Sequence, residues 1–246
     1  MHHFFVEPSK VNDNKITITG TDVNHIKNVL RMKNGEEAII SDGEGKDYLC
    51  KIAAYEDESV ILDIVEENVL RTELGTKFYL FQGLPKSEKM ELIVQKTVEL
   101  GVYEIIPVNM KRCIVKLDDK KKDSKIKRWQ AIAESAAKQS KRGIIPEVKE
   151  VMNFNEAMDY AGGLDMVIMP YENHKGMAET KKILADIKPG MSVGIFIGPE
   201  GGFDEKEVES AINQGIRPIT LGKRILRTET AGLAILSVLM FMTEED

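Results

Sequence analysis

The amino-acid sequence predicts an α/β fold, a parallel sheet covered by helices, preceded by a small amino-terminal β-barrel. Up to residue 72, short runs that alternate apolar and polar residues are separated by turn sequences, a pattern typical of antiparallel strands. From Gly75 onward, apolar runs of strand length alternate with longer helical patterns, which favours a parallel sheet. The chain has 246 residues, 42% of them hydrophobic, and is long enough for two domains. We therefore assign residues 1–72 to the barrel and residues 73–246 to the α/β domain.

Four strands of the barrel are indicated by alternation between Asn-Gly, Asp-Gly and Asp-Glu turns. They cover residues 15–19, 37–41, 48–53 and 60–65. Residues 28–31 indicate a short helix between the first two strands. Its last residue, Arg31, has two interpretations: contact with a nucleic-acid phosphate, or an ion pair with a surface acid such as Glu36.

The α/β domain is predicted as a series of strands and helices that ends in an unusually apolar helix. The predicted strands are residues 78–82, 104–108, 166–169, 193–197 and 218–221. The predicted helices are residues 87–100, 126–140, 178–187, 205–214 and 229–241. The last helix is apolar on nearly every side, which indicates burial between layers or between subunits.

Two glycine-punctuated loops, residues 198–203 and 221–231, each follow one of the predicted strands. Open α/β sheets bind ligands at the loops outside the carboxyl ends of their strands. Glycine lets the backbone approach a ligand closely or adopt a positive φ. The sequence therefore predicts one small-molecule pocket that both loops form.

The pocket lacks the features of nucleotide and polyphosphate sites. No G-x-G-x-x-G opens a helix after a strand, and no Gly-Lys-Ser/Thr closes a glycine loop. Asp204, with Glu207 three residues later, predicts a capped and acidic start to the helix that ends before Gly215. Such a start repels phosphate, because its carboxylates already complement the helix dipole. A ligand held mainly by the backbone, without polyphosphate and with positive charge, fits better.

The charged residues are distributed unevenly along an acidic chain. The formal net charge is −6, yet residues 111–142 are rich in lysine and arginine. The basic residues of this stretch are Lys111, Arg112, Lys116, Lys120, Lys121, Lys122, Lys125, Lys127, Arg128, Lys138, Lys141 and Arg142. From charge alone, a nucleic-acid surface and a solvated helix face are equally good interpretations.

Neither a disulfide framework, a zinc site nor a secretory signal is indicated. Cys50 and Cys113 are far apart and lack metal-ligand spacing. The longest apolar run is too short to cross a bilayer, and no signal region precedes the chain's first strand. We expect a cytoplasmic protein without a bound metal.

Several motifs, in order along nearly the whole chain, resemble the ribosomal RNA small subunit methyltransferase E family. They are residues 25–32 with Gly35, residues 99–102 with Pro107, Ala133-Glu134, Gln139-Ser140 with Arg142 and Pro146, and the two glycine loops. The resemblance implies a SPOUT-type trefoil-knotted domain, a PUA-like barrel that helps to bind RNA, and a homodimer. It also implies S-adenosylmethionine as methyl donor and N3 of a 16S rRNA uridine, within the 30S subunit, as acceptor. His2-His3 stand where the family often has an arginine before Phe4-Phe5.

Carried onto this sequence, the resemblance assigns the donor site and the RNA contacts. The expected donor-binding residues are Gly198, Glu200, Gly201, Gly202, Leu221, Gly222, Ile225, Leu226 and Arg227. The expected RNA-binding residues are Arg31, Lys86, Lys111, Arg112 and Arg142.

The chemistry of the implied reaction requires a cation beside the uracil. N3 must lose its proton before it attacks, and the negative charge spreads onto the two carbonyl oxygens. Arg227 is the first candidate, because it precedes Thr228, the predicted cap of the final helix, and Arg142 is the second. The alternative for each arginine is a phosphate contact or an intersubunit salt bridge.

Glu200 is the carboxylate that the donor loop offers. It either fixes the loop and the donor, which we favour, or acts as the base, and Glu229 is the rival base. His25 and His174 are less suited, because neither is tied to a glycine loop. Three other functions stay open: a SPOUT enzyme for another rRNA or tRNA position, a non-catalytic RNA-binding ribosome-assembly factor, and a small-molecule enzyme that uses the same pocket. The last fits least well, because it would need neither the barrel nor the basic stretch.

Overall fold

The computed structural model describes residues 1–70, 72–115, 117–172 and 176–244, except the side chain at position 119. The chain forms two compact units. The first contains Met1–Glu73 together with Ala137–Ile145, and the second contains Leu74–Ala136 together with Pro146–Asp246. The sequence analysis assigned residues 137–145 to the α/β domain, whereas the structure places them with the first unit.

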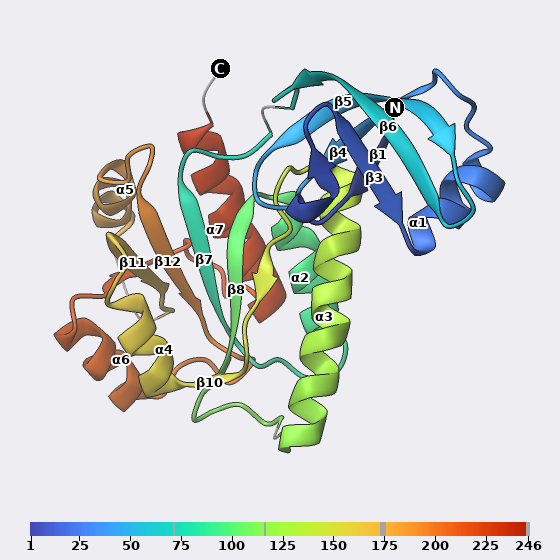
Figure 1. Cartoon of the computed structure of the whole chain (residues 1–246). Helices are drawn as coiled ribbons and strands as arrows, with labels where there is room; N and C mark the ends of the chain where they lie inside the picture. Colours follow the sequence, from blue (N-terminus) through green and yellow to red (C-terminus); the bar gives the residue numbers. More distant parts are fainter. Residues whose placement is uncertain (71, 116, 173–175, 245–246) are drawn as a thin grey trace. The chain divides into compact units, whose positions relative to one another are not determined.

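The first unit is built on a curled sheet of six strands with the order β1-β4-β5-β6-β3-β2 (Figure 1). Its strands are β1 (His2–Phe5), β2 (Val11–Asn12), β3 (Lys15–Thr19), β4 (Glu37–Ser41), β5 (Asp47–Tyr55) and β6 (Ser59–Glu67). β1 pairs parallel to β4, and the other pairs are antiparallel. All four predicted strands are present, and β1 and β2 were not predicted, because neither shows sustained alternation.

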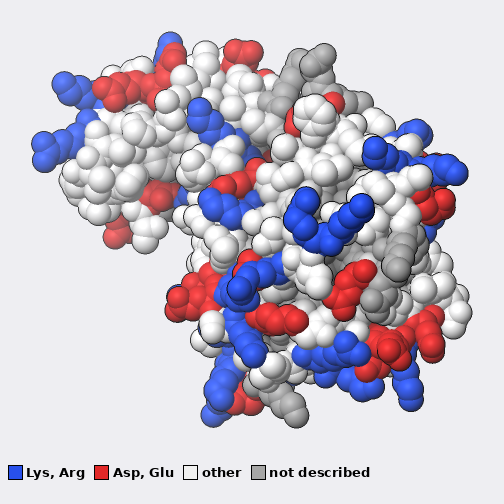
Figure 2. Space-filling view, turned by 180° about the vertical axis from the view of Figure 1, so that it is seen from behind, with Lys and Arg blue, Asp and Glu red and all other residues white. Residues whose placement is uncertain are grey.

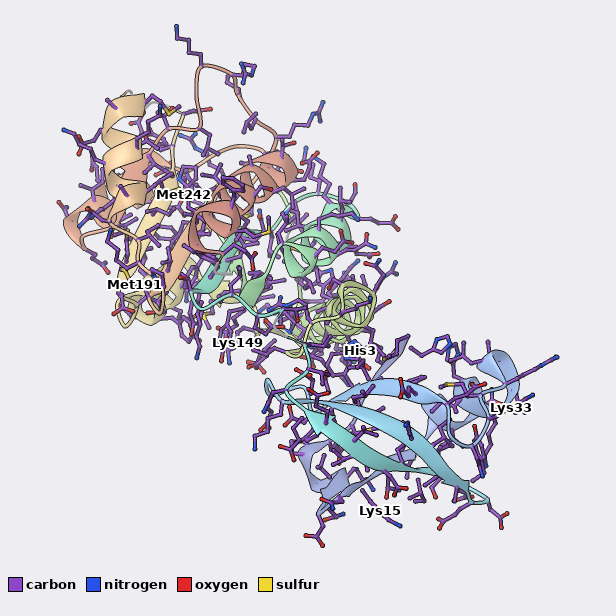
Figure 3. The ribbon with its side chains drawn as sticks, turned by 90° about the horizontal axis from the view of Figure 1, so that it is seen from above. His3, Lys15, Lys33, Lys149, Met191 and Met242 are labelled. Atoms are coloured by element: carbon purple, nitrogen blue, oxygen red, sulfur yellow. The ribbon has the colours of Figure 1, made fainter. Side chains whose placement is uncertain are left out.

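Alternation along β3 explains how this sheet buries a core. Ile16 and Ile18 are buried, while Lys15 and Thr19 are exposed. Lys15 is labelled in Figure 3, together with Lys33 of the same unit. A short helical segment, made of α1 (Thr21–Asn24) and η2 (His25–Leu30), follows β3. It ends at Arg31, whose φ of 54° is left-handed and closes the turn.

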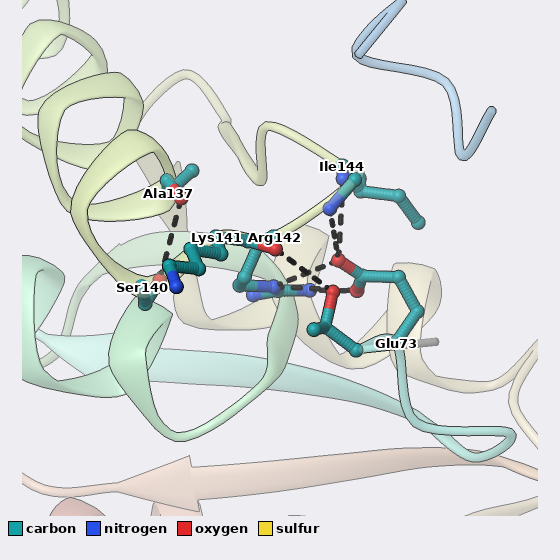
Figure 4. A network of polar contacts seen from close by, with 8 residues as sticks. Glu73, Ala137, Ser140, Lys141, Arg142 and Ile144 are labelled. Atoms are coloured by element: carbon teal, nitrogen blue, oxygen red, sulfur yellow. Dashed lines mark hydrogen bonds and ion pairs between the residues drawn. The ribbon is translucent and has the colours of Figure 1, made fainter. Parts of the chain in front are cut away.

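A polar network explains why residues 137–145 belong to the first unit (Figure 4). Arg142 donates to both carboxylate oxygens of Glu73, with its closest contact at 2.6 Å. The amides of Gly143 and Ile144 donate to the Oε1 atom of Glu73, at 2.9 and 3.2 Å. Ile144 also forms β-bridges with Gly43 and the following residue. Glu73 thereby joins the end of helix α3 to the sheet.

The second unit contains a parallel sheet with the order β10-β8-β7-β12-β11-β13. Its strands are β7 (Lys77–Gly83), β8 (Val102–Asn109), β9 (Glu147–Val148), β10 (Met152–Asn153), β11 (Met166–Pro170), β12 (Ser192–Ile197) and β13 (Arg217–Ile219), with β9 paired to β8. Its helices are α2 (Lys89–Glu99), α3 (Asp119–Ser140), α4 (Phe154–Ala161), α5 (Met177–Ala185), α6 (Glu205–Asn213) and α7 (Thr228–Thr243), and the last turn of α3, residues 137–140, belongs to the first unit. The alternation of strands and helices therefore predicted the architecture correctly.

Helices cover both faces of this sheet (Figure 1). Gly232 of α7 lies against Leu80 and Gln82, which are alternate residues of β7. Phe81, between them, stacks on Phe196 and meets the ring of Tyr160 on α4. Because successive side chains of a strand point to opposite faces, α7 and α4 lie on opposite sides of the sheet.

Two differences from the predicted elements have local causes. The helix α4 was not predicted, although Asn153 and Glu156 form the capping box that starts it. α3 begins at Asp119, seven residues before the predicted start, in a lysine-rich turn without an apolar pattern. No helix among the described residues is long and apolar enough to span a membrane.

Candidate functional site

A cavity of about 370 Å³ opens at the carboxyl ends of three neighbouring strands of the second unit. Its walls come from the segments after β11, β12 and β13, and from the first residues of α2 and α7. Both predicted glycine loops line it, as the sequence predicted, and that it binds a small molecule stays a prediction. Of the nine expected donor-binding residues, all except Gly201 line the cavity.

The first glycine loop folds back on itself. The amide of Gly202 donates to the carbonyl of Pro199 at 2.9 Å. Gly202 has a φ of 66°, which side chains rarely adopt, and a Cβ on Gly198 would lie 3.2 Å from the backbone of Gly202. Glycine at both positions therefore allows a turn tight enough to leave its backbone facing the cavity.

The second loop is joined to the end of β11. The amide of Tyr171 donates to the carbonyl of Ile219 at 2.9 Å, and the amide of Thr220 donates to Thr180 Oγ1 on α5. These bonds fix the start of the loop. Beyond it, Ile225 is 84% exposed, so most of its side chain faces solvent although it also lines the cavity.

Thr228 connects the two loops through its hydroxyl group. The hydroxyl donates to the carbonyl of Gly198 at 2.6 Å and accepts from the buried amide of Gln82 at 2.9 Å. The prediction that Thr228 caps the last helix is wrong. Arg227 is the N-cap, through its backbone carbonyl, and Thr228 is the first helical residue. Its hydroxyl is already engaged by the first loop.

A lysine bridges two carboxylates at one end of the cavity. Lys89 Nζ lies 3.2 Å from Glu200 Oε1 and 3.2 Å from Glu229 Oε2. Glu200 Oε1 also accepts from the amide of Lys86 at 3.0 Å. Burial raises the pKa of Glu200, but hydrogen bonds from backbone amides and Lys89 outweigh it, so the net shift is downward. Hydrogen bonding to Glu200 raises the pKa of Lys89, so both groups are charged at neutral pH.

The acidic start of α6 is confirmed, and it is neutralised. Asp204 and Glu207 form a capping box. Lys111 Nζ lies 2.9 Å from Asp204 Oδ1 and, with other donors, lowers the pKa of Asp204. Arg112 donates to the carbonyl of Gly201 at 3.2 Å. Lys111 and Arg112, two expected RNA contacts, thus hold the segment after β8 against the first glycine loop.

The remaining residues expected to contact RNA or substrate differ in exposure and in whether an acid pairs with their side-chain cation. Arg227 and Arg31 are exposed, and neither guanidinium forms a hydrogen bond or ion pair with a described residue. The ion pair considered between Arg31 and Glu36 is therefore absent among the described residues. Lys86 is exposed and contributes its amide to Glu200. Arg142 is 4% exposed, lies in the first unit and does not line the cavity.

Many cations of the basic stretch are paired with acids. Besides Lys111, Arg112 and Arg142, the pairs are Lys121 with Asp118, Arg128 with Glu91 and Lys138 with Asp22. Figure 2 shows Lys and Arg side chains interspersed with Asp and Glu side chains over one face of the molecule. Lys116 and His174 lie outside the described residues.

Sequence reasoning missed three residues that shape the cavity: Lys89, Glu172 and Thr228. Glu172 had a detectable signal, because it follows the predicted strand at 166–169, the third to end at this edge. Lys89 had no detectable sequence signal, because its partners Glu200 and Glu229 lie more than a hundred residues later in the sequence. Among the described residues, no group of three His, Cys, Asp or Glu is placed to hold a metal ion.

Comparisons with known proteins match both units. An RNA methyltransferase domain model matches residues 72–240, and an RNA methyltransferase PUA domain model matches residues 18–65. The ribosomal RNA small subunit methyltransferase E of Bacillus subtilis is 37% identical, over 99% of this chain and 98% of that protein. The chain belongs to this family.

Solved structures agree with the family assignment. A crystal structure of a hypothetical protein is 36% identical, covers 99% of both chains and has a TM-score of 0.90. The ribosomal RNA small subunit methyltransferase E of Neisseria gonorrhoeae, solved with S-adenosylmethionine bound, is 31% identical, covers 98% of both chains and has a TM-score of 0.82. The parallel sheet, the curled sheet and the PUA domain are therefore shared with relatives along the whole chain.

Proposed function

We propose that this chain is the S-adenosylmethionine-dependent methyltransferase for N3 of one uridine in 16S rRNA. The observation that carries the proposal is the cavity formed by the two glycine loops in a member of this family. Methylation of ribosomal RNA with this donor follows from membership of the family, whose Neisseria gonorrhoeae member was solved with the donor bound. The N3 position and the 30S context are the finer parts of the proposal, and a ribosomal substrate suits a cytoplasmic enzyme.

The cavity suits the donor in size and chemistry. About 370 Å³ lies within the range of small-molecule pockets. Gly198, Gly202 and Leu221 bring backbone to the cavity wall, where main-chain groups can read an adenine edge, and Leu226 supplies apolar surface. Glu172 also lines the cavity and forms no ion pair with a described residue, so its carboxylate suits a cationic ligand. When bound, the donor supplies a methyl group on a positively charged sulfur.

Arg227 is the residue that we assign to charge stabilisation. N3 loses its proton to a base, its electron pair forms the bond to the methyl carbon, and the carbon–sulfur electrons return to sulfur. The uracil oxygens carry negative charge before this transfer. An exposed guanidinium at the cavity, not engaged by a described acid, is placed to receive that charge.

Glu200 is better suited to fixing the donor loop than to acting as a base. Its pKa is lowered and its carboxylate already accepts from Lys86 and Lys89, so it has little tendency to take a proton at neutral pH. Glu229 is the alternative base, although Lys89 lies 3.2 Å from its carboxylate as well. For Arg142 we favour a structural role, because its guanidinium is buried against Glu73.

A homodimer and a trefoil knot are part of the proposal. α2 packs beside α7, and together they expose Leu92, Val238, Phe241 and Met242, the last labelled in Figure 3. A second copy of the chain is the proposed cover of this apolar face. The knot is supported by the path of the chain, because α7 returns from the edge strand β13 to pack on β7 and β12.

The test is transfer of labelled methyl from S-adenosylmethionine to 30S subunits that lack the modification. Free 16S rRNA and tRNA are assayed alongside, and the product nucleotide is mapped by nuclease digestion and mass spectrometry. We expect N3-methyluridine at one 16S site. Label in tRNA or at another rRNA position would support a different SPOUT specificity, and donor binding without transfer would support the assembly-factor alternative.

A further inference from the structure

Lys89 joins three elements that are distant in sequence. It is the first residue of α2, Glu200 lies in the loop after β12, and Glu229 lies in the first turn of α7. One ammonium contacts both carboxylates at 3.2 Å. The Lys89 contact therefore lies at the end of the cavity, where the 198–202 loop meets the start of α7.

The two carboxylates depend on this ammonium. Among the described residues, no other side-chain cation pairs with Glu200 or Glu229. The side chains are only 27% and 18% exposed, so water screens their charges poorly. Without Lys89, two like charges would face one another and would push the donor loop away from α7.

Apart from Lys89, few contacts fix the carboxylates of Glu200 and Glu229. Glu200 keeps one hydrogen bond from the Lys86 amide. Glu229 Oε2, the oxygen 3.2 Å from Lys89 Nζ, accepts no hydrogen bond from a described residue, so the Lys89 contact holds it as an ion pair. The Thr228 hydroxyl anchors Gly198, at the start of the same loop. The loop is thus held at its start by Thr228, at Glu200 by Lys89 and at Gly201 by Arg112.

We propose that Lys89 is a positioning residue for the donor site, which holds the 198–202 loop against α7 by bridging Glu200 and Glu229. This inference rests on the proposed function, because it takes the cavity as the donor site. Lys89 acts through the two acids and the loop, so it affects donor affinity more than the chemical step.

The test is titration of S-adenosylmethionine into wild type, Lys89→Met and Lys89→Arg by isothermal calorimetry. Methionine keeps most of the length of the side chain without its charge, and we expect the Kd to rise about ten-fold, equivalent to about 1.4 kcal/mol. Arginine keeps the charge and can bridge two carboxylates, so we expect most of the affinity to return. Lys96→Met is the matched control, because Lys96 pairs only with Glu99 along the same helix in the described chain and does not line the cavity.

A second variant separates positioning from general stability. Adding Glu229→Gln to Lys89→Met removes one of the two facing charges, and we expect it to recover part of the lost donor affinity. In steady state, Lys89→Met should raise the KM for the donor and leave the KM for RNA unchanged.

The outcomes distinguish the inference from the function on which it rests. Wild type that does not bind the donor overturns both. Wild type that binds, with Lys89→Met binding equally well or with no recovery in the double variant, overturns the positioning role alone. A change in the free energy of unfolding without a change in Kd also overturns it.

Discussion

Arg227 combines a fixed backbone with an exposed cation. Its backbone carbonyl starts α7 by accepting from the amides of Thr230 and Ala231, so the main chain is fixed. Its guanidinium is exposed at the cavity and forms no ion pair with a described residue. A fixed backbone with an uncommitted cation suits a group that must meet charge only during reaction.

Arg227→Ala should therefore slow methyl transfer without weakening donor binding. We expect kcat to fall about 100-fold to 1,000-fold, as when a donor to a developing oxyanion is removed. The measurements are single-turnover transfer to 30S subunits and calorimetric donor binding. Arg224→Ala, which removes a neighbouring exposed cation of the same loop, is the comparison. A loss of donor affinity as large as the loss of rate would assign Arg227 to the donor instead.

Glu200 should make stability depend on pH in the acidic range. Its pKa in the folded chain lies below the ordinary value of 4.5, which holds in the unfolded chain. The stabilisation is therefore complete above pH 4.5 and is lost as the pH falls through the lower, folded pKa. Urea unfolding of wild type and Glu200→Gln between pH 3 and 7 checks this. We expect the two curves to converge at low pH, and parallel curves would contradict the assignment.

At the scale of elements, the sequence predicted those whose pattern is local. Alternation gave the bounds of β3 and β4, and periodicity with Asp204 and Gly215 gave α6. β9 and β10 were missed because two residues carry no period, and they exist only through pairing with β8. Residues 137–145 belong to the first unit because Arg142 pairs with Glu73, and no local sequence pattern predicts this contact.

The same limit applied to the site. Glycine loops after strands are local signals, and they located the cavity. The Lys89 bridge and the Thr228 hydroxyl bond join residues that only the folded sheet brings together. Roles that depend on such contacts were not predictable from residue type, as Arg142 illustrates. Its guanidinium was expected at RNA and is buried against Glu73.

Arg142→Ala should destabilise the protein rather than change its chemistry. Removing Arg142 leaves the half-buried carboxylate of Glu73 with only the amides of Gly143 and Ile144, and we expect a loss of about 3 kcal/mol in the free energy of unfolding. Denaturant unfolding measures this. Lys51→Ala is the control, since its pair with Glu37 is exposed and should contribute less than about 1 kcal/mol. Unchanged stability with lost RNA binding would restore the RNA contact.

At the scale of the whole molecule, α2 and α7 expose an apolar face that contains Leu92, Val238, Phe241 and Met242, and we propose that a second copy of the chain covers it. Phe241 is 84% exposed, and Val238 and Met242 on the same helix are about half exposed. We propose a homodimer formed through this face, so Phe241→Glu should give monomers, because the charge would be buried at that interface. Light scattering after gel filtration gives the mass. Ile212→Glu, an exposed apolar residue on α6, is the control and should leave the dimer intact.

The central claim is that the cavity between the two glycine loops is the donor site. The most direct measurement is a crystal structure of the protein with S-adenosylhomocysteine, the product of the donor. We expect the adenosyl group between residues 198–202 and 221–227, with Lys89 still bridging Glu200 and Glu229. An adenosyl group bound elsewhere would contradict the assignment of the donor site. An adenosyl group between the two loops with the Lys89 bridge broken would contradict only the positioning role of Lys89.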